Sequence, residues 1–136
     1  MNMISLQRRN VEYEIKSYKA YKLEYDQIKQ DILYGALRFD DENVGGGKSN
    51  LPTKPTEDRV IAVSLSSKLQ RLDKIIRVVE MIYMSLDSEK QAFMRMFFWE
   101  RKFTIDGVAS ELHISRRTAF RWKKEIINSV AVHLGY

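Results

Sequence analysis

Residues 104–126, TIDGVASELHISRRTAFRWKKEI, predict two helices joined by a tight turn. Apolar residues at helical spacing indicate a short first helix over 105–112, and His113 and Ile114 then form the turn. Ser115 is expected to cap a second helix, because its hydroxyl can accept a hydrogen bond from a free backbone N–H in the first turn. Two helices connected in this way have the form of a helix-turn-helix.

The second of these helices carries two stripes of opposite character. Ala119, Trp122 and Ile126 recur at spacings that predict an inward face. The opposite stripe is basic, and arginine can bind guanine edges in the major groove of DNA. Lys123 lies off this reading face and is expected to contact phosphates. The residues predicted to bind DNA are Ser115, Arg116, Arg117, Phe120, Arg121, Lys123 and Lys124.

The charge distribution agrees with a polyanionic partner. Residues 1–66 carry ten Lys or Arg and ten Asp or Glu, whereas residues 67–136 carry thirteen and eight, an excess of five positive charges. No acidic residue occurs in 112–124, where five cations gather. The positive excess therefore coincides with the predicted recognition helix, which favours double-stranded DNA as the ligand.

The composition narrows the class of protein. The chain of 136 residues has no cysteine, which excludes disulfides, thiolate zinc sites and cysteine nucleophiles. No apolar run approaches the roughly 20 residues that span a bilayer, and the N-terminus lacks the apolar core of a signal peptide. We therefore expect a cytoplasmic protein without a membrane partner.

Two long amphipathic helices are predicted before the basic region. One covers residues 5–37, which contain no proline, and the other covers 56–86. Leu65 to Leu86 gives about three heptads of a coiled-coil-like stripe. The two helices could form an antiparallel hairpin, a dimer seam or both. A single apolar stripe packed on another leaves little core, so we favour self-association as a dimer. Tyr13, Tyr18, Tyr21 and Tyr25 resemble a stacking set for nucleic acid, but packing on a helix face is the favoured interpretation.

Residues 38–55, RFDDENVGGGKSNLPTKP, predict a flexible connector between the long helices. The segment GGGKS invites comparison with a phosphate-binding loop. That loop needs a glycine where this chain has Glu42, and it follows a strand, which is not predicted here. A connector is therefore favoured over a nucleotide site.

The sequence shows no constellation typical of an enzyme. Asp87 is expected to cap a third helix over 88–101, whose many aromatic residues predict the core of a C-terminal domain. His113 and His133 are the only histidines and have no metal-binding spacing. We therefore expect no catalytic residues, no metal and no cofactor.

The block from Leu86 to Val130 resembles the promoter-binding fourth region of bacterial sigma factors. The shared features are a capped helix, an aromatic stretch and the order T-I-x-x-V-A-x-x-L-x-I-S-x-R-T. The whole chain is similar to the small phage and prophage transcriptional regulators of the RinA and ArpU type. The features that carry this second likeness are YKAYK at residues 18–22, PTE at residues 55–57 and HISRRT at residues 113–118.

These resemblances imply a sequence-specific transcription activator of late or packaging genes that works with host RNA polymerase, associated with the nucleoid of a bacterial host cell. By position, Arg116, Arg117, Phe120 and Arg121 fall where the sigma region reads bases. Arg117 stands where sigma factors often have Glu, and Phe120 where they often have Arg, so an operator sequence does not carry over. Phe120 could touch thymine methyl groups or could tuck against its own domain.

We therefore predict an all-α protein with two parts. Residues 1–86 form a long helical hairpin that serves oligomerisation and includes the connector 38–55. Residues 87–136 form a sigma-like helix-turn-helix domain that binds DNA. Two alternatives stay open: a phage small terminase subunit, which would assemble as a closed ring, and an adaptor that docks on RNA polymerase without reading DNA.

Overall fold

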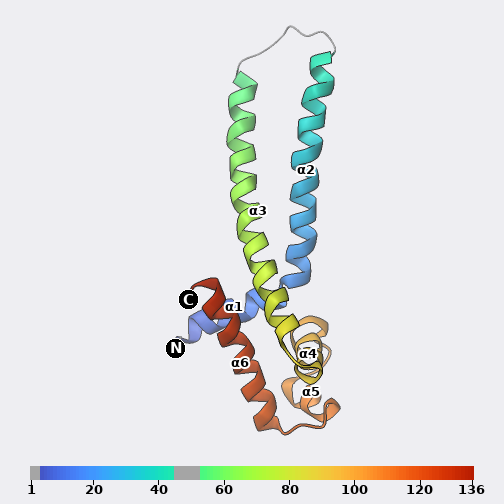
Figure 1. Cartoon of the computed structure of the whole chain (residues 1–136), viewed down its shortest axis with the longest axis vertical. Helices are drawn as coiled ribbons and strands as arrows, with labels where there is room; N and C mark the ends of the chain where they lie inside the picture. The colour runs from blue at the N-terminus through green and yellow to red at the C-terminus, as the bar shows by residue number, and fades with distance from the viewer. Residues whose placement is uncertain (1–3, 45–52) are drawn as a thin grey trace. The chain divides into compact units, whose positions relative to one another are not determined.

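The computed structural model describes the backbone of residues 4–44 and 53–136 and the side chains of residues 4–35 and 66–136. The described backbone is helical and contains no strand, which confirms the all-α class. Within this part of the chain, no helix is both long and apolar enough to cross a membrane. The elements in chain order are α1 (Ser5–Lys16), α2 (Tyr18–Val44), α3 (Thr53–Ser85), α4 (Ser88–Met94), the π-helix η1 (Arg95–Glu100), α5 (Ile105–Glu111) and α6 (Arg116–Leu134), as Figure 1 shows.

The chain divides into two compact units. One combines Met1–Ala20 with Lys74–Tyr136, and the other is Tyr21–Asp73. The first helix and the last turns of α3 thus pack with the C-terminal elements, whereas the sequence placed them in a separate hairpin of residues 1–86. The assignment of that hairpin to oligomerisation stays a prediction.

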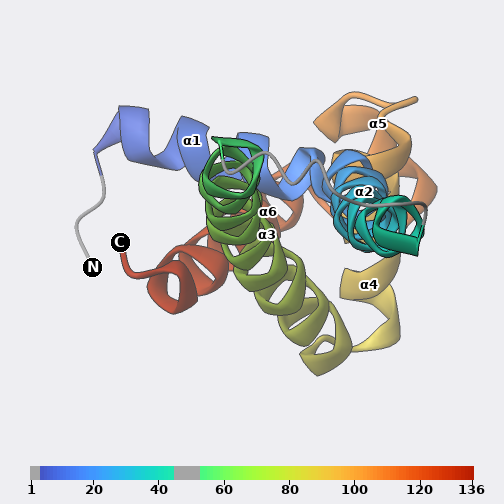
Figure 2. The same ribbon diagram turned by 90° about the horizontal axis from the view of Figure 1, so that it is seen from above.

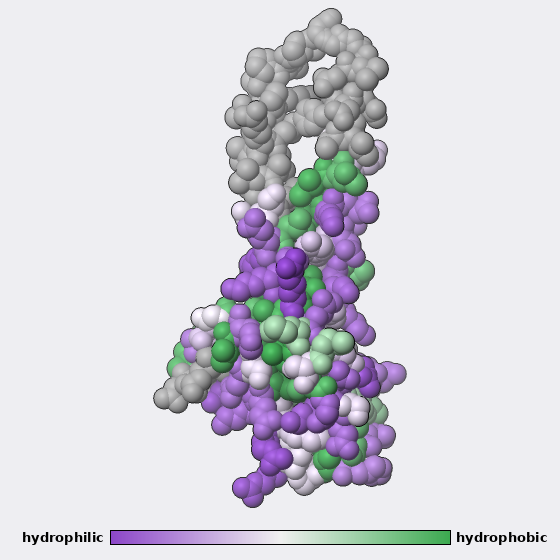
Figure 3. Space-filling model, viewed as in Figure 1, coloured by the Kyte–Doolittle hydropathy of each residue, from purple (hydrophilic) through white to green (hydrophobic). Residues whose placement is uncertain are grey.

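The unit Tyr21–Asp73 consists of antiparallel stretches of α2 and α3 (Figure 1). Lys68 Nζ lies 2.5 Å from Glu24 Oε1, which links the two helices. Ile28 and Leu72 are buried, but Leu33 is 59% exposed. Figure 3 shows apolar surface over α2 directly below the grey atoms. This unit therefore leaves part of its apolar surface in contact with solvent.

The helices extend further into the predicted connector than expected. α2 continues to Val44 and α3 begins at Thr53. The reason is local, because no glycine or proline stands between residues 36 and 44 to end the helix. The glycine segment 45–52, with the rejected phosphate loop, lies outside the described residues.

The predicted first helix is interrupted at Ser17. This residue ends α1 with φ −86° and ψ 3°, and α2 begins at Tyr18. The Ile15 carbonyl accepts a hydrogen bond from the indole Nε1–H of Trp99 at 3.0 Å. The last carbonyls of a helix lack partners within the helix. Trp99 of η1 therefore supplies a hydrogen-bond donor to one carbonyl near the end of α1.

The core of the larger unit lies where α1 packs on α6 (Figure 2) and on η1. Val11 and Ile15 of α1 have no exposed surface, and neither do Phe93 and Phe98 of the aromatic stretch. The rings of Phe93 and Trp122 meet edge to face with centroids 6.0 Å apart. The prediction that the aromatic residues form a core is confirmed.

The predicted helix over 88–101 changes character halfway. Asp87 caps it as expected, since its side chain accepts from Lys90 N at 2.9 Å. After Met94 the backbone becomes the π-helix η1, and Arg101 ends it in the left-handed region with φ 56°. The wider π turn alters which side chains point inward, and sequence periodicity of 3.6 could not predict that change.

Candidate nucleic-acid interface

A short helix and a sharp turn precede the basic helix. Thr104 caps α5, because its side chain accepts from Gly107 N at 3.2 Å. Space at Gly107 is tight, since an added Cβ would lie 3.2 Å from Phe103 Cβ. Val108 and Ala109 are buried between α5 and its neighbours. α5 therefore begins and packs as the sequence predicted.

The turn itself reverses the chain through a left-handed residue. His113 has φ 57°, and its N–H donates to Ser110 O at 3.2 Å. Ile114 N donates to Ala109 O at 3.0 Å. These two bonds form a Schellman motif, which satisfies the last carbonyls of α5 and aims the chain into α6.

The inward face of α6 is fixed by burial. Ser115 caps the helix, with its Oγ accepting from Thr118 N at 3.0 Å, and it also donates to Thr118 Oγ1. Ala119, Trp122 and Ile126 are buried, as their spacing predicted. The helix ends at Leu134, and Gly135 follows with φ 94°. The face opposite this buried stripe is therefore held outward by the core.

Five of the predicted DNA-binding residues lie on that outward face and are exposed: Arg116, Arg117, Phe120, Arg121 and Lys124. Arg116 Nε lies 3.0 Å from Asp106 Oδ1, and Arg121 Nε lies 3.9 Å from Glu125 Oε1. Within the residues that the structure describes, Arg117 and Lys124 have no acidic partner. Their charges are available to an anionic ligand, and exposed pairs such as the other two are weak.

Lys123 points elsewhere. Its Nζ lies 3.0 Å from Glu12 Oε1 of α1 and 5.3 Å from the centroid of the Phe97 ring. Lys123 therefore lies off the exposed row of cations on α6. Its charge is paired with Glu12 of α1. This geometry does not favour a contact between Lys123 and phosphate, which stays a prediction.

Glu12 of α1 forms ion pairs with two lysines, Lys123 of α6 and Lys16 of α1. Its carboxylate also accepts Lys16 Nζ at 3.2 Å. Burial alone would raise the pKa of Glu12, but the hydrogen bonds and charges of Lys123 and Lys16 outweigh burial and lower this pKa below its ordinary value. Sequence reasoning missed Glu12, because nothing near residue 12 signals a contact with residue 123.

Phe120 does not tuck into its own domain. Its side chain is 44% exposed, and the Arg116 guanidinium carbon lies 5.4 Å from the centre of its ring. The structure therefore places Phe120 on the outward face among the cations. Of the two positions that the sequence left open for this ring, the outward one is observed.

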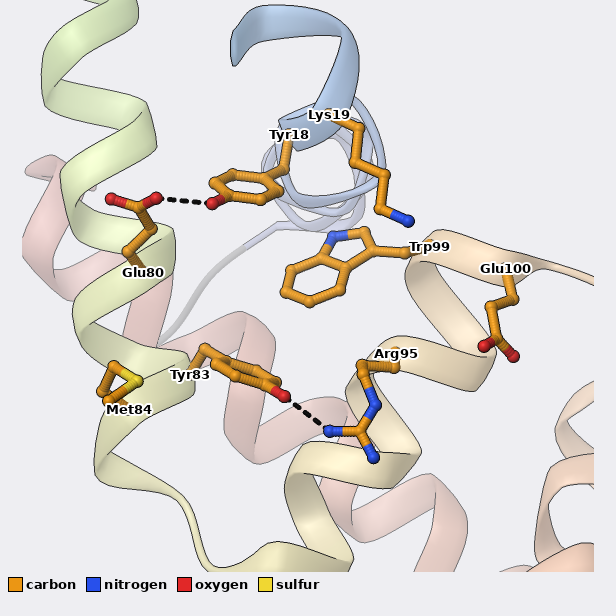
Figure 4. A pocket seen from close by; sticks show the side chains of 8 residues that line it. All are labelled: Tyr18, Lys19, Glu80, Tyr83, Met84, Arg95, Trp99 and Glu100. Carbon is orange, nitrogen blue, oxygen red and sulfur yellow. Dashed lines mark hydrogen bonds between the residues drawn. The ribbon is translucent and has the colours of Figure 1, made fainter.

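An aromatic pocket of about 470 Å³ lies near the start of α2. The Trp99 ring lies between Tyr18 and Tyr83, with centroid distances of 5.1 and 5.3 Å (Figure 4). Tyr18 donates to Glu80, and Arg95 donates to the Tyr83 hydroxyl. The rings thus pack on one another and their polar atoms are engaged, so Tyr18 is a packing residue, as favoured from the sequence.

Metal-binding side chains do not gather in the described part of the chain, where no group of three His, Asp or Glu is placed to hold an ion. His133 Nδ1 lies 2.9 Å from Ser129 O in its own helix. The exposed basic face of α6 is therefore the strongest candidate site among the described residues.

Comparisons with known proteins identify a family and one relative. A family model described as "Protein of unknown function (DUF722)" matches residues 18–132. The chain is 27% identical over 127 residues to the transcriptional activator RinA of Staphylococcus phage phi11, covering 93% of this chain and 89% of that protein. No solved structure matches the chain significantly.

Proposed function

The chain belongs to the family described as "Protein of unknown function (DUF722)". We propose that it is a phage transcription regulator that binds specific DNA sequences through α6. Its similarity over most of its length to a phage transcriptional activator supports the regulatory role. One observation carries the proposal of DNA binding: α6 buries one face completely and exposes a row of cations on the other.

In this proposal the α5–turn–α6 segment acts as a helix-turn-helix. A helix with its side chains is roughly 10–12 Å wide and fits a major groove about 12 Å wide. Arg117, Phe120, Arg121 and Lys124 are spaced three or four residues apart and lie along one side of the helix. Arg117 and Arg121 are proposed to bind guanine edges, and Lys124 a phosphate. Ser115 serves as the cap that orients these residues.

The remaining parts of the proposal concern partners. Activation would recruit host RNA polymerase, and the long helices would hold two copies together so that two half-sites are read an integral number of helical turns apart. The exposed apolar surface of α2 supports self-association. In this proposal each compact unit has one role. The unit that contains α6 binds DNA, and the unit Tyr21–Asp73 binds a second copy of the chain.

The test is a binding titration of the full chain on a duplex that it selects from a random pool. Arg117→Ala should weaken binding to that duplex by about 1–3 kcal/mol and have little effect on a random duplex. Arg9→Ala, which removes an exposed arginine from α1, is the matched control and should bind almost as the wild type does. Equal losses on both duplexes would make Arg117 a phosphate contact.

Salt separates the rival functions. Each phosphate contact makes the logarithm of the affinity fall with the logarithm of the salt concentration, with a slope of roughly −0.9 per contact. Absence of salt-dependent binding would contradict DNA recognition and favour an adaptor that docks on RNA polymerase. A closed ring of many copies in solution would favour a terminase subunit over a dimeric regulator.

A further inference from the structure

One large apolar side chain stands in the middle of a basic row. Phe120 is 44% exposed, whereas its neighbours Ala119 and Trp122 are 0% and 8% exposed. Single exposed apolar residues are common and need no explanation by themselves. Phe120 differs because it stands among cations and the Arg116 guanidinium lies against its ring.

The Phe120 ring lies against one member of an ion pair. The Arg116 guanidinium carbon lies 5.4 Å from the ring centroid, within the range of a cation–π contact. Arg116 Nε in turn lies 3.0 Å from Asp106 Oδ1 of α5. Asp106 of α5, Arg116 and the Phe120 ring thus form a row of contacts from one helix to the next. The ring presents its apolar surface next to Arg117 and Arg121 on the exposed face of α6.

The major groove offers one matching group. Base edges there present hydrogen-bond donors and acceptors, and the apolar exception among the four ordinary bases is the 5-methyl group of thymine. Arginine and lysine side chains next to the ring can bind guanine and phosphate, but the ring itself gains only from an apolar contact. An apolar ring between cations therefore matches a site in which a thymine, with its 5-methyl group, lies beside the bases or phosphates that the cations bind.

We infer that Phe120 is a specificity-determining residue that contacts a thymine 5-methyl group, and that Arg116 and Asp106 are positioning residues for its ring. The inference rests on the proposed DNA-binding function and names the chemical group that the centre of the α6 face reads. Arg116 then differs from Arg117, because its guanidinium supports the ring while that of Arg117 remains available to a base.

The test uses the full-length protein and the duplex that it selects from a random pool. Each thymine is replaced in turn by deoxyuridine, which removes only the 5-methyl group. At one position in each half-site the wild type should bind about fourfold more weakly, the effect expected for one buried methyl group. Phe120→Ala should bind thymine and uracil equally at that position, and Phe120→Leu should keep part of the preference.

Three variants separate the reading of the methyl group from general affinity. Arg117→Ala should weaken binding but keep the fourfold ratio of thymine to uracil. Asp106→Asn should reduce the ratio, because it removes the acid that holds Arg116 behind the ring. The thermal midpoint of Phe120→Ala should match the wild type, because the removed ring is outside the core.

Two results would overturn the inference and can be told apart. If a duplex is selected but no uracil substitution weakens binding, or if Phe120→Ala keeps the same ratio, the protein reads DNA without this contact. If no duplex is enriched from the pool, the proposed DNA-binding function itself fails, and the inference fails with it.

Discussion

The two compact units of this chain use apolar residues in opposite ways. In the unit that contains α6, Phe93, Phe98 and Ile15 have no exposed surface and belong to its core. In the unit Tyr21–Asp73, Leu23 is 73% exposed and Leu33 is 59% exposed. Similar amphipathic patterns in the sequence thus lead to a self-contained core in one unit and to uncovered surface in the other.

This difference separates stability from association. A side chain that is buried within one chain contributes to folding, whereas an exposed apolar side chain on a helix contributes when another surface covers it. Core substitutions in the first unit should therefore lower the free energy of unfolding. Substitutions at the exposed leucines of the second unit should alter self-association and leave the fold intact.

The largest effect is expected at Trp122. Trp122→Ala should lower the free energy of unfolding by about 3–5 kcal/mol, because it removes a buried indole that packs edge to face on Phe93. Urea unfolding followed by circular dichroism measures the change. Phe120→Ala, on the exposed side of the same helix, is the control and should stay within about 0.5 kcal/mol. Equal effects of the two variants would contradict the assignment of faces.

The next effect tests whether α1 belongs to the core around α6. Ile15→Ala should cost about 2–5 kcal/mol of unfolding free energy, since Ile15 is fully buried although it lies far from α6 in the sequence. Leu23→Ala removes an exposed side chain of similar size from the other unit and should change stability little. If both variants unfold at the wild-type urea concentration, α1 is not part of the core.

A smaller effect is expected on association. Leu33→Glu should weaken self-association about tenfold, or about 1.4 kcal/mol, because it places a charge in the apolar surface proposed as the seam. Analytical ultracentrifugation of the full chain measures the equilibrium. Gln30→Glu introduces the same charge at an exposed polar position of α2 and serves as control. A wild type that is monomeric at tens of micromolar would refute the proposed seam.

The smallest effect concerns the acid that binds Lys123. The pKa of Glu12 is lower in the folded chain than in the unfolded one, so its contribution is complete above about pH 4.3 and is lost as the pH falls through the folded pKa. Glu12→Gln should cost less than about 1 kcal/mol at pH 7. The difference from wild type should vanish in acid.

Glu24→Gln is the matched variant in the other unit, where Glu24 pairs with Lys68 at a more exposed position. It should change stability less than Glu12→Gln does, because exposed ion pairs are weak. Urea titrations at several pH values compare the two. A difference between Glu12→Gln and wild type that persists in acid would show that packing, and not charge, explains the effect.

The sequence was informative where structure depends on nearby residues. The caps at Asp87 and Ser115 and the buried stripe of Trp122 and Ile126 follow from spacings within one or two turns, and each is observed. The outward position of the α6 cations could be predicted for the same reason, since the buried stripe determines the opposite face.

Features that depend on distant partners could not be predicted. The interruption at Ser17 coincides with a hydrogen bond from Trp99, and the direction of Lys123 depends on Glu12. The π-helix after Met94 departs from the 3.6-residue period on which sequence patterns rest. The orientation of Phe120 required the position of Asp106 relative to Arg116, which only the packing of α5 on α6 determines.

The hydrogen bond from Trp99 to Ile15 also has a consequence for folding during synthesis. Its two ends are 84 residues apart, and ribosomes add roughly 5–20 residues per second. α1 therefore leaves the ribosome on the order of ten seconds before the residues that complete its core. Contacts of such high sequence separation form late, because loop closure costs entropy before the contacts are made. The unit that contains α6 should thus complete its core only after translation has passed α6.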